Sequence, residues 1–254
     1  MALQVIDISV ADLFHKDAAY CFLAGSGISI AAPSSLPTGY QFTQSLLRHI
    51  LPHDYVDIIL DLADPLRQDK KAEGHFLRFE QLMGFLQESI DAELHVLDCF
   101  AESTQPNFNH LFLASLIEKG CPVFTTNFDG LIEYALMRLG VDKRRITPVI
   151  DRGTWESETI QGFPVYKLHG SLMDCCSGAS ARSSIQATIE HIVQQKQGDT
   201  FVLEAWKMAH LRRELQQRDL VIIGYSGLDD FDILPSLKAL GATSGLYGSH
   251  IQKT

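Results

Sequence analysis

The feature that most constrains the fold is a set of four short apolar runs, each of which stops at glycine or polar residues. The runs are residues 20–24, 121–125, 163–168 and 219–224. Their lengths and their stops indicate buried β-strands rather than helices. Helical periodicity fills much of the chain between them, and a further strand is expected at residues 146–150. This alternation predicts an α/β fold, a Rossmann-like parallel sheet with helices on both faces.

The stretch between the first two runs is too long to be a simple crossover helix. From about residue 40 to 119 its apolar residues recur at helical spacing, as they do from Phe79 to Ile90, with Leu94 and Leu97 extending the same pattern. We therefore expect a helical module inserted at about residues 40–119 into a single domain that spans residues 1–254.

The last apolar run is followed by a helix pattern at residues 231–240, for which Asp229 or Asp230 is the expected N-cap. Residues 241–254 show no strand pattern, although a doubly wound sheet usually continues after such a helix. We expect no further strand there, and a C-terminal end that is truncated or stops early.

Charge and composition exclude several classes of protein. The chain has 21 Lys and Arg residues against 31 Asp and Glu residues, a formal net charge of −10. We expect such an acidic chain to bind nucleic acid and anionic membrane surfaces poorly. No apolar run approaches the roughly 18 residues of a membrane helix, and the N-terminus lacks a secretory pattern. Because the five cysteines contain no Cys-x-x-Cys, we expect a cytoplasmic protein without a disulfide framework or zinc site.

Small and polar segments follow the four principal runs, at the sheet edge where ligands bind in parallel α/β folds. Each segment is a weak signal by itself. Gly25-Ser26-Gly27 is as consistent with a tight turn as with a phosphate cradle. His169 alone is more often a structural hydrogen-bonding residue, and Asn127 and Asp129 are also suited to capping the next helix.

Taken together and in this order, the segments resemble the sirtuin family, and in particular its sirtuin-like NAD hydrolases of bacterial anti-phage defence. The resemblance spans about residues 18 to 238. It rests on Gly25-Ser26-Gly27-Ile28-Ser29, Leu36-Pro37-Thr38, Pro106-Asn107 with His110, Thr125-Thr126-Asn127-Phe128-Asp129, Leu168-His169-Gly170 and Gly224-Tyr225-Ser226.

Departures from the deacylase pattern set this chain apart from lysine deacylases. Thr126 stands where deacylases carry Gln, and the spacing between Asn127 and His169 is much longer than in typical deacylases. The two Cys-x-x-Cys pairs of the family's zinc ribbon are missing, and only the adjacent Cys175 and Cys176 lie in that region.

The resemblance implies that NAD is the substrate and that no metal is needed. It assigns catalysis to Asn127, which would position a water molecule and the ribose hydroxyls, and to His169, which would take a proton. Asp129 is expected to orient its loop or cap a helix. The NAD-binding positions implied are Gly25, Ser26, Gly27, Ser29, Pro37, Thr38, Thr126, Asp129, Gly224 and Ser226.

The expected product pair is nicotinamide and ADP-ribose, made by an NAD-depleting effector of anti-phage defence. By the same resemblance we expect a homo-oligomer or a complex with a sensor partner. Two alternatives stay open at this point. One is an NAD-dependent protein deacylase, and the other is a catalytically silent module that binds NAD or ADP-ribose.

Overall fold

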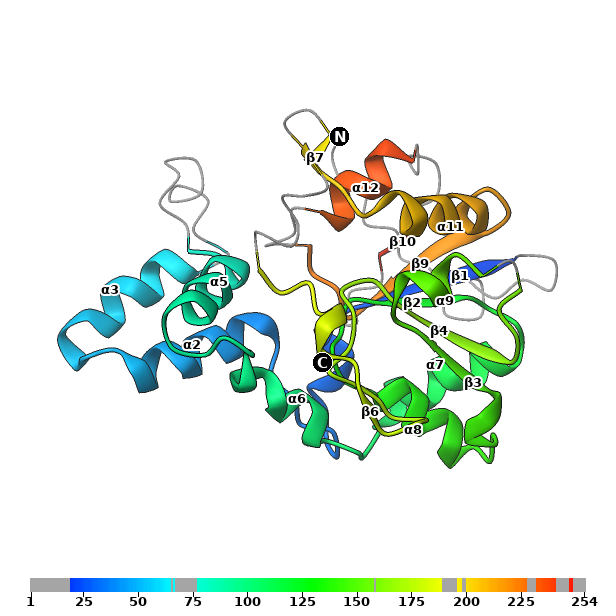
Figure 1. Cartoon of the computed structure of the whole chain (residues 1–254), viewed down its shortest axis with the longest axis horizontal. Coiled ribbons are helices and arrows are strands. Elements are labelled where there is room, and N and C mark those ends of the chain that lie inside the picture. The colour runs from blue at the N-terminus through cyan, green and yellow to red at the C-terminus, as the bar shows by residue number, and fades with distance from the viewer. Residues whose placement is uncertain are drawn as a thin grey trace.

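The structure is a computed structural model that describes residues 19–64, 66, 77–157, 159–188, 196–197, 200–227, 232–240 and 247–248. Within these residues, six parallel strands form one sheet in the order β10-β9-β1-β2-β4-β3 (Figure 1). The predicted Rossmann-like α/β fold is confirmed. The strands are β1 (Tyr20–Ala24), β2 (Val123–Thr125), β3 (Ile146–Val149), β4 (Phe163–Lys167), β9 (Asp219–Ile223) and β10 (Tyr247–Gly248).

The remaining elements comprise helices, short 3₁₀ turns and two small antiparallel hairpins. The helices are α2 (Gly39–Ile50), α3 (His53–Ala63), α5 (Phe79–Ser89), α6 (Cys99–Glu102), α7 (Phe108–Glu118), α8 (Leu131–Arg138), α9 (Arg152–Trp155), α11 (Ala205–Leu215) and α12 (Ile233–Ala239). The 3₁₀ turns are η1 (Ser26–Ser29), η2 (His95–Asp98), η3 (Lys143–Arg145) and η4 (Arg182–Ser184). The hairpins pair β5 (Met173–Asp174) with β6 (Ala179–Ser180), and β7 (Lys196–Gln197) with β8 (Thr200–Phe201).

The central strand β1 supplies both cores of the sheet, because successive side chains of a strand point to opposite faces. Phe22 and Ala24 pack in the core that α7 and α8 cover. Cys21 and Leu23 pack in the opposite core, with α9, α11 and α12. The two groups of helices lie on opposite sides of the sheet in Figure 1. A strand buried on both faces has no solvent side, which is why β1 is apolar throughout.

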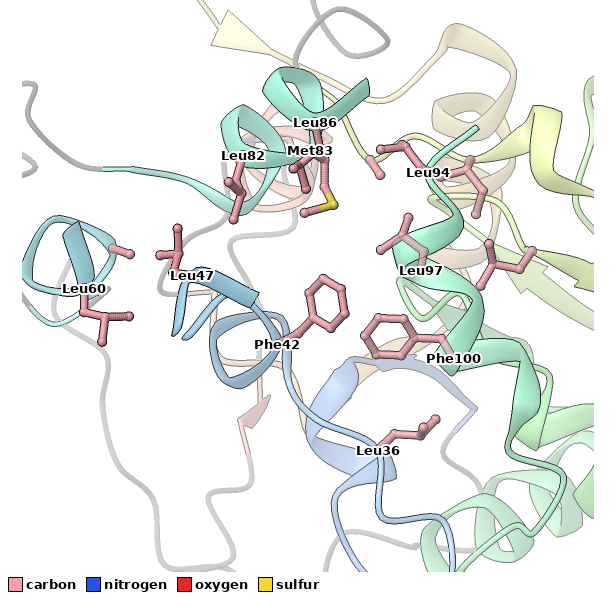
Figure 2. Close-up of a cluster of buried hydrophobic side chains, with 14 of the residues drawn as sticks. Leu36, Phe42, Leu47, Leu60, Leu82, Met83, Leu86, Leu94, Leu97 and Phe100 are labelled. Atoms are coloured by element: carbon pink, nitrogen blue, oxygen red, sulfur yellow. The ribbon is translucent and has the colours of Figure 1, made fainter. Parts of the chain in front are cut away.

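The helical module between β1 and β2 has a core of its own (Figure 2). Phe42 of α2 and Phe100 of α6 lie with their ring centroids 5.2 Å apart at its centre. The same core takes in Leu131 of α8, together with Leu172 and Ile185 from the segment after β4. The module therefore packs directly on the chain that carries the carboxyl ends of β2 and β4.

Three local expectations are corrected. The helix that starts at Phe79 ends at Ser89 and does not continue to Leu97, because the Asp91 carboxylate accepts from the backbone N–H groups of His95 and Val96 and starts a separate turn. The final helix begins at Ile233 after Asp232, and the expected caps Asp229 and Asp230 lie outside the described residues. A sixth strand, β10, follows where none was expected.

No helix in the part of the chain that the structure describes is both long and apolar enough to cross a membrane.

Candidate functional site

Strand register places the two candidate catalytic residues at the same level of the sheet edge. In the parallel pair β2–β4, Thr125 lies opposite Lys167. Asn127 and His169 each follow two residues later, so they leave neighbouring strands at matching positions. Ser26 and Tyr225 occupy the same level beyond β1 and β9, because Ala24 pairs with both Thr125 and Ile223. The predicted segments therefore meet along one edge.

Asn127 is buried, and its carboxamide is held from one side. Its Nδ2 donates to Ser29 Oγ at 3.2 Å and to Asp129 Oδ2 at 3.4 Å. Its Oδ1 is buried and has no hydrogen-bond partner among the described residues. An amide oxygen withdrawn from water without a donor is costly, so this atom is suited to accept a hydrogen bond from a ligand.

The hydroxyl of Ser29 connects Asn127 to a buried histidine. The backbone N–H of Asn107 donates to His110 Nδ1 at 3.2 Å, so the neutral ring carries its proton on Nε2. His110 Nε2 then donates to Ser29 Oγ at 3.1 Å, and Ser29 Oγ donates to Asp129 Oδ2 at 3.0 Å. Burial lowers the pKa of His110 to about 4, which keeps the ring neutral near pH 7.

Asp129 is bonded to the start of α8 and to the neighbouring strand. Its Oδ1 accepts from the backbone N–H of Leu131, the first residue of the helix, at 3.0 Å, while Gly130 occupies the N-cap position. Its backbone carbonyl accepts from Lys167 Nζ at 2.5 Å, and the same ammonium pairs with Glu133 Oε1 at 3.1 Å. Burial opposes the charge on Lys167, but Glu133 and Asp129 outweigh it and raise the pKa of Lys167. Sequence reasoning assigned no role to Lys167 or Glu133.

His169 forms a pair with an acidic residue that sequence reasoning missed. His169 Nε2 lies 2.9 Å from Asp232 Oδ2. Burial opposes protonation of the ring, but the Asp232 carboxylate outweighs it and raises the pKa of His169. For Asp232, burial raises the pKa of the carboxyl group, but the imidazole of His169 outweighs this effect and lowers that pKa. The only sequence signal was an acidic cluster before the last helix, within which Asp232 was not distinguished.

The backbone on either side of His169 is fixed by buried groups. The His169 carbonyl accepts from the Gln186 N–H at 3.0 Å. The preceding carbonyl, that of Leu168, accepts from Lys207 Nζ at 2.5 Å. Gly170 has φ of +80°, which only glycine adopts without strain. The loop that carries His169 is thus anchored at three successive residues.

The glycines of the first and last segments bring two loops into direct contact. The Gly25 N–H donates to the Ile223 carbonyl at 3.0 Å, and the Gly27 N–H donates to the Gly224 carbonyl at 2.8 Å. A Cβ on Gly27 would lie 2.6 Å from that Gly224 oxygen. Both N–H groups are therefore hydrogen-bonded within the protein. Phosphate binding by Gly25, Ser26 and Gly27 stays a prediction, as does contact of Ser29 with NAD.

The other predicted binding residues lie around this centre. Thr38 caps α2, with its Oγ1 accepting from the Gln41 N–H at 3.2 Å, and Pro37 is the half-buried residue before it. The Thr126 N–H donates to the Ala24 carbonyl at 3.1 Å. Ser226 is exposed just beyond β9. Their contacts with NAD stay predictions.

Helix α5 of the module contacts the segment that carries Asn127 and the chain that follows His169. The rings of Phe79 and Phe128 are stacked, with centroids 6.5 Å apart, and Phe128 is the residue between Asn127 and Asp129. Gly84 lies against Thr188, past the His169 loop, since a Cβ there would lie 3.9 Å from Thr188 Cβ. The acidic side chain of Glu80 on this helix raises the pKa of His169 as a minor contribution.

Cys175 and Cys176 lie in the turn between β5 and β6, and both are free thiols. A Cβ on Gly130 would lie 3.0 Å from Cys175 Sγ, so this turn packs on the Asn127–Gly130 loop. Among the residues that the structure describes, no group of three or more His, Cys, Asp or Glu side chains could hold a metal ion.

Comparison with curated proteins gives no match. A family profile described as a SIR2-like domain matches residues 122–252, just over half of the chain. The matched range contains Asn127, His169, Ser226 and Asp232, and it begins after the Gly25-Ser26-Gly27 segment. The sirtuin resemblance drawn from the motifs is confirmed at this level, and the chain belongs to the SIR2-like domain family, whose activities are NAD-related.

Proposed function

We propose that the chain is an NAD hydrolase that cleaves the bond between nicotinamide and ribose, giving nicotinamide and ADP-ribose. The observation that carries the proposal is the Asn127 carboxamide. Its nitrogen is oriented by Ser29 and Asp129, and its buried oxygen has no donor among the described residues. An uncharged acceptor preorganised in this way suits a substrate hydroxyl or a water molecule.

The chemistry requires positioning more than acid strength. Nicotinamide leaves as a neutral molecule from a cationic starting state, and the transition state resembles the oxocarbenium ion of other glycoside cleavages. Asn127 Oδ1 would accept a hydrogen bond from the attacking water or a ribose hydroxyl, which sets the line of attack. His169, in its neutral form, would act as the general base and take the proton that the water molecule or the ribose hydroxyl releases.

The wider role that we propose is NAD depletion as an effector of bacterial anti-phage defence. We propose that the active form is a homo-oligomer or a complex with a sensor partner, and that the protein acts in the cytoplasm. The sirtuin-like resemblance of the ordered motifs supports these proposals, as does the family membership of the chain.

The test is nicotinamide release from NAD by the purified chain, followed by chromatography. Asn127→Ala and His169→Ala are each expected to reduce the rate by roughly 10²-fold or more. The matched control is His95→Ala, because the His95 side chain is 67% exposed and forms its ion pair with Asp98, at 3.2 Å. The control is expected to keep the wild-type rate.

Other outcomes separate the alternatives. Release that survives in both Asn127→Ala and His169→Ala would refute the assigned roles. Deacylation of an acetyl-lysine peptide that depends on NAD would favour the deacylase. Binding of NAD by calorimetry without turnover would favour a silent module, and the absence of binding would overturn the NAD proposal for this chain.

A further inference from the structure

The inference concerns Asp232 and the ring nitrogen of His169 that it contacts. Asp232 directly precedes α12. Its Oδ2 lies 2.9 Å from His169 Nε2, across 63 positions of sequence. The side chains are 16% and 5% exposed, so water screens this pair poorly.

This contact determines which nitrogen of the neutral ring carries the proton. An ionised carboxylate can only accept hydrogen bonds, so Nε2 must be the protonated nitrogen when it faces Asp232. The lone pair of the neutral ring is then on Nδ1. Among the described residues, Nδ1 has no hydrogen-bond partner, which leaves it available to a substrate or water.

The charged groups around His169 come from three elements. Asp232 precedes α12, Lys207 lies on α11 and Glu80 lies on α5. Lys207 opposes a positive charge on the ring, and Glu80 favours it more weakly than Asp232 does. Of the three, only Asp232 is hydrogen-bonded to the imidazole. The orientation of the ring therefore depends on this one carboxylate.

We propose that Asp232 is the positioning residue of His169: its carboxylate accepts a hydrogen bond from the Nε2–H of His169, which leaves Nδ1 to accept the proton released in the reaction. The proposal rests on the proposed function, because it assigns His169 the role of base. It adds the atom that performs the step and the residue that selects it. No bond to Asp232 forms or breaks, and the carboxylate stays ionised throughout.

The first test does not require activity. Nitrogen NMR of the full chain, labelled in its ten histidines, distinguishes a protonated Nε2 from a protonated Nδ1. His169→Gln identifies the signals by their loss. The expected result is Nε2–H with an unprotonated Nδ1 above the pKa of His169. The opposite tautomer would overturn the proposal, whether or not the chain hydrolyses NAD.

The second test is the rate of nicotinamide release by Asp232→Asn between pH 5 and 9. The base acts when it is neutral, so a plot of rate against pH has a rising limb at the pKa of His169 and a plateau above it. Removal of the adjacent charge is expected to move this limb down by about one pH unit and to lower the plateau by at least about 10-fold, with KM for NAD nearly unchanged. A merely structural role would lower the plateau without moving the limb.

Asp98→Asn is the matched control, because the Asp98 carboxylate pairs with Arg182 and His95 and not with His169. It is expected to leave both the limb and the plateau at wild-type values. An Asp232→Asn profile that coincides with that of wild type would overturn the proposal. If wild type releases no nicotinamide, the proposed function fails, and the NMR result still decides whether Asp232 selects the tautomer.

Discussion

Ser29→Ala tests whether the hydrogen-bonded cluster around Asn127 has the energetic importance that its geometry indicates. The hydroxyl makes three contacts in a buried site: it accepts from His110 Nε2 at 3.1 Å and from Asn127 Nδ2 at 3.2 Å, and it donates to Asp129 Oδ2 at 3.0 Å. The substitution removes one oxygen and adds no bulk. Its effect on stability is measurable without NAD, so the result does not depend on the proposed activity.

The expected magnitude follows from what each partner loses. His110 Nε2–H would remain buried without an acceptor, at a cost of about 1–3 kcal/mol. Asn127 and Asp129 keep their mutual contact, and each loses a net hydrogen bond of about 1 kcal/mol. The free energy of unfolding should therefore fall by roughly 3–5 kcal/mol, which is a large part of the 5–15 kcal/mol typical of a folded domain.

The assay is urea unfolding followed by circular dichroism at pH 7.5, with Ser34→Ala as the matched control. Ser34 is also buried, but its hydroxyl makes a single hydrogen bond, to the Gln105 carbonyl at 2.9 Å. That variant should lose only about 1 kcal/mol. If the two alanine variants lose the same free energy of unfolding, the cluster contributes nothing beyond one hydrogen bond, and the reasoning is refuted.

Three further predictions concern the support of the same edge. Lys167→Met leaves Glu133 buried without its cation and should cost about 3–5 kcal/mol of unfolding free energy by urea titration, and adding Glu133→Leu to that variant should restore part of the loss. His110 has a folded pKa of about 4 against 6.5 unfolded, so the free energy of unfolding should fall by up to about 3 kcal/mol as pH drops from 6.5 to 4, and His110→Phe should flatten that slope. Gly27→Ala should lower the melting temperature because its Cβ would lie 2.6 Å from a carbonyl oxygen, whereas Gly39→Ala, with nothing within 4 Å of its Cβ, should not.

Local sequence patterns predicted the parts of the fold that local physics determines. β1 is a short run buried at every position, and β9 is a short apolar run buried at Leu220 and Val221, so composition alone identifies both strands. Asparagine is a common N-cap residue, and Asn107 caps α7 by accepting from the N–H of Asn109. Patterns of this kind depend on contacts between residues close in sequence, which a single sequence displays directly.

The features that the sequence did not predict depend on contacts between distant segments. Asp232 faces His169 only because α12 returns over the sheet edge, and nothing within its own segment distinguishes it from Asp229 or Asp230. Two buried lysines show the same limit. Lys167 ends an apolar run and Lys207 lies on the polar-rich helix α11, and a lysine is ordinarily expected at the surface. Their burial follows from carbonyl and carboxylate partners that tertiary packing supplies.

The helical module reaches the candidate site through more than one contact, and Phe128 makes one of them. Phe128 lies between Asn127 and Asp129, and its ring packs against Phe79 of α5 and Phe100 of α6, with centroids 6.5 and 6.4 Å away. Glu80, also on α5, raises the pKa of His169 as a minor contribution. Helix α5 therefore acts on the surroundings of both Asn127 and His169, although the two residues follow different strands of the sheet.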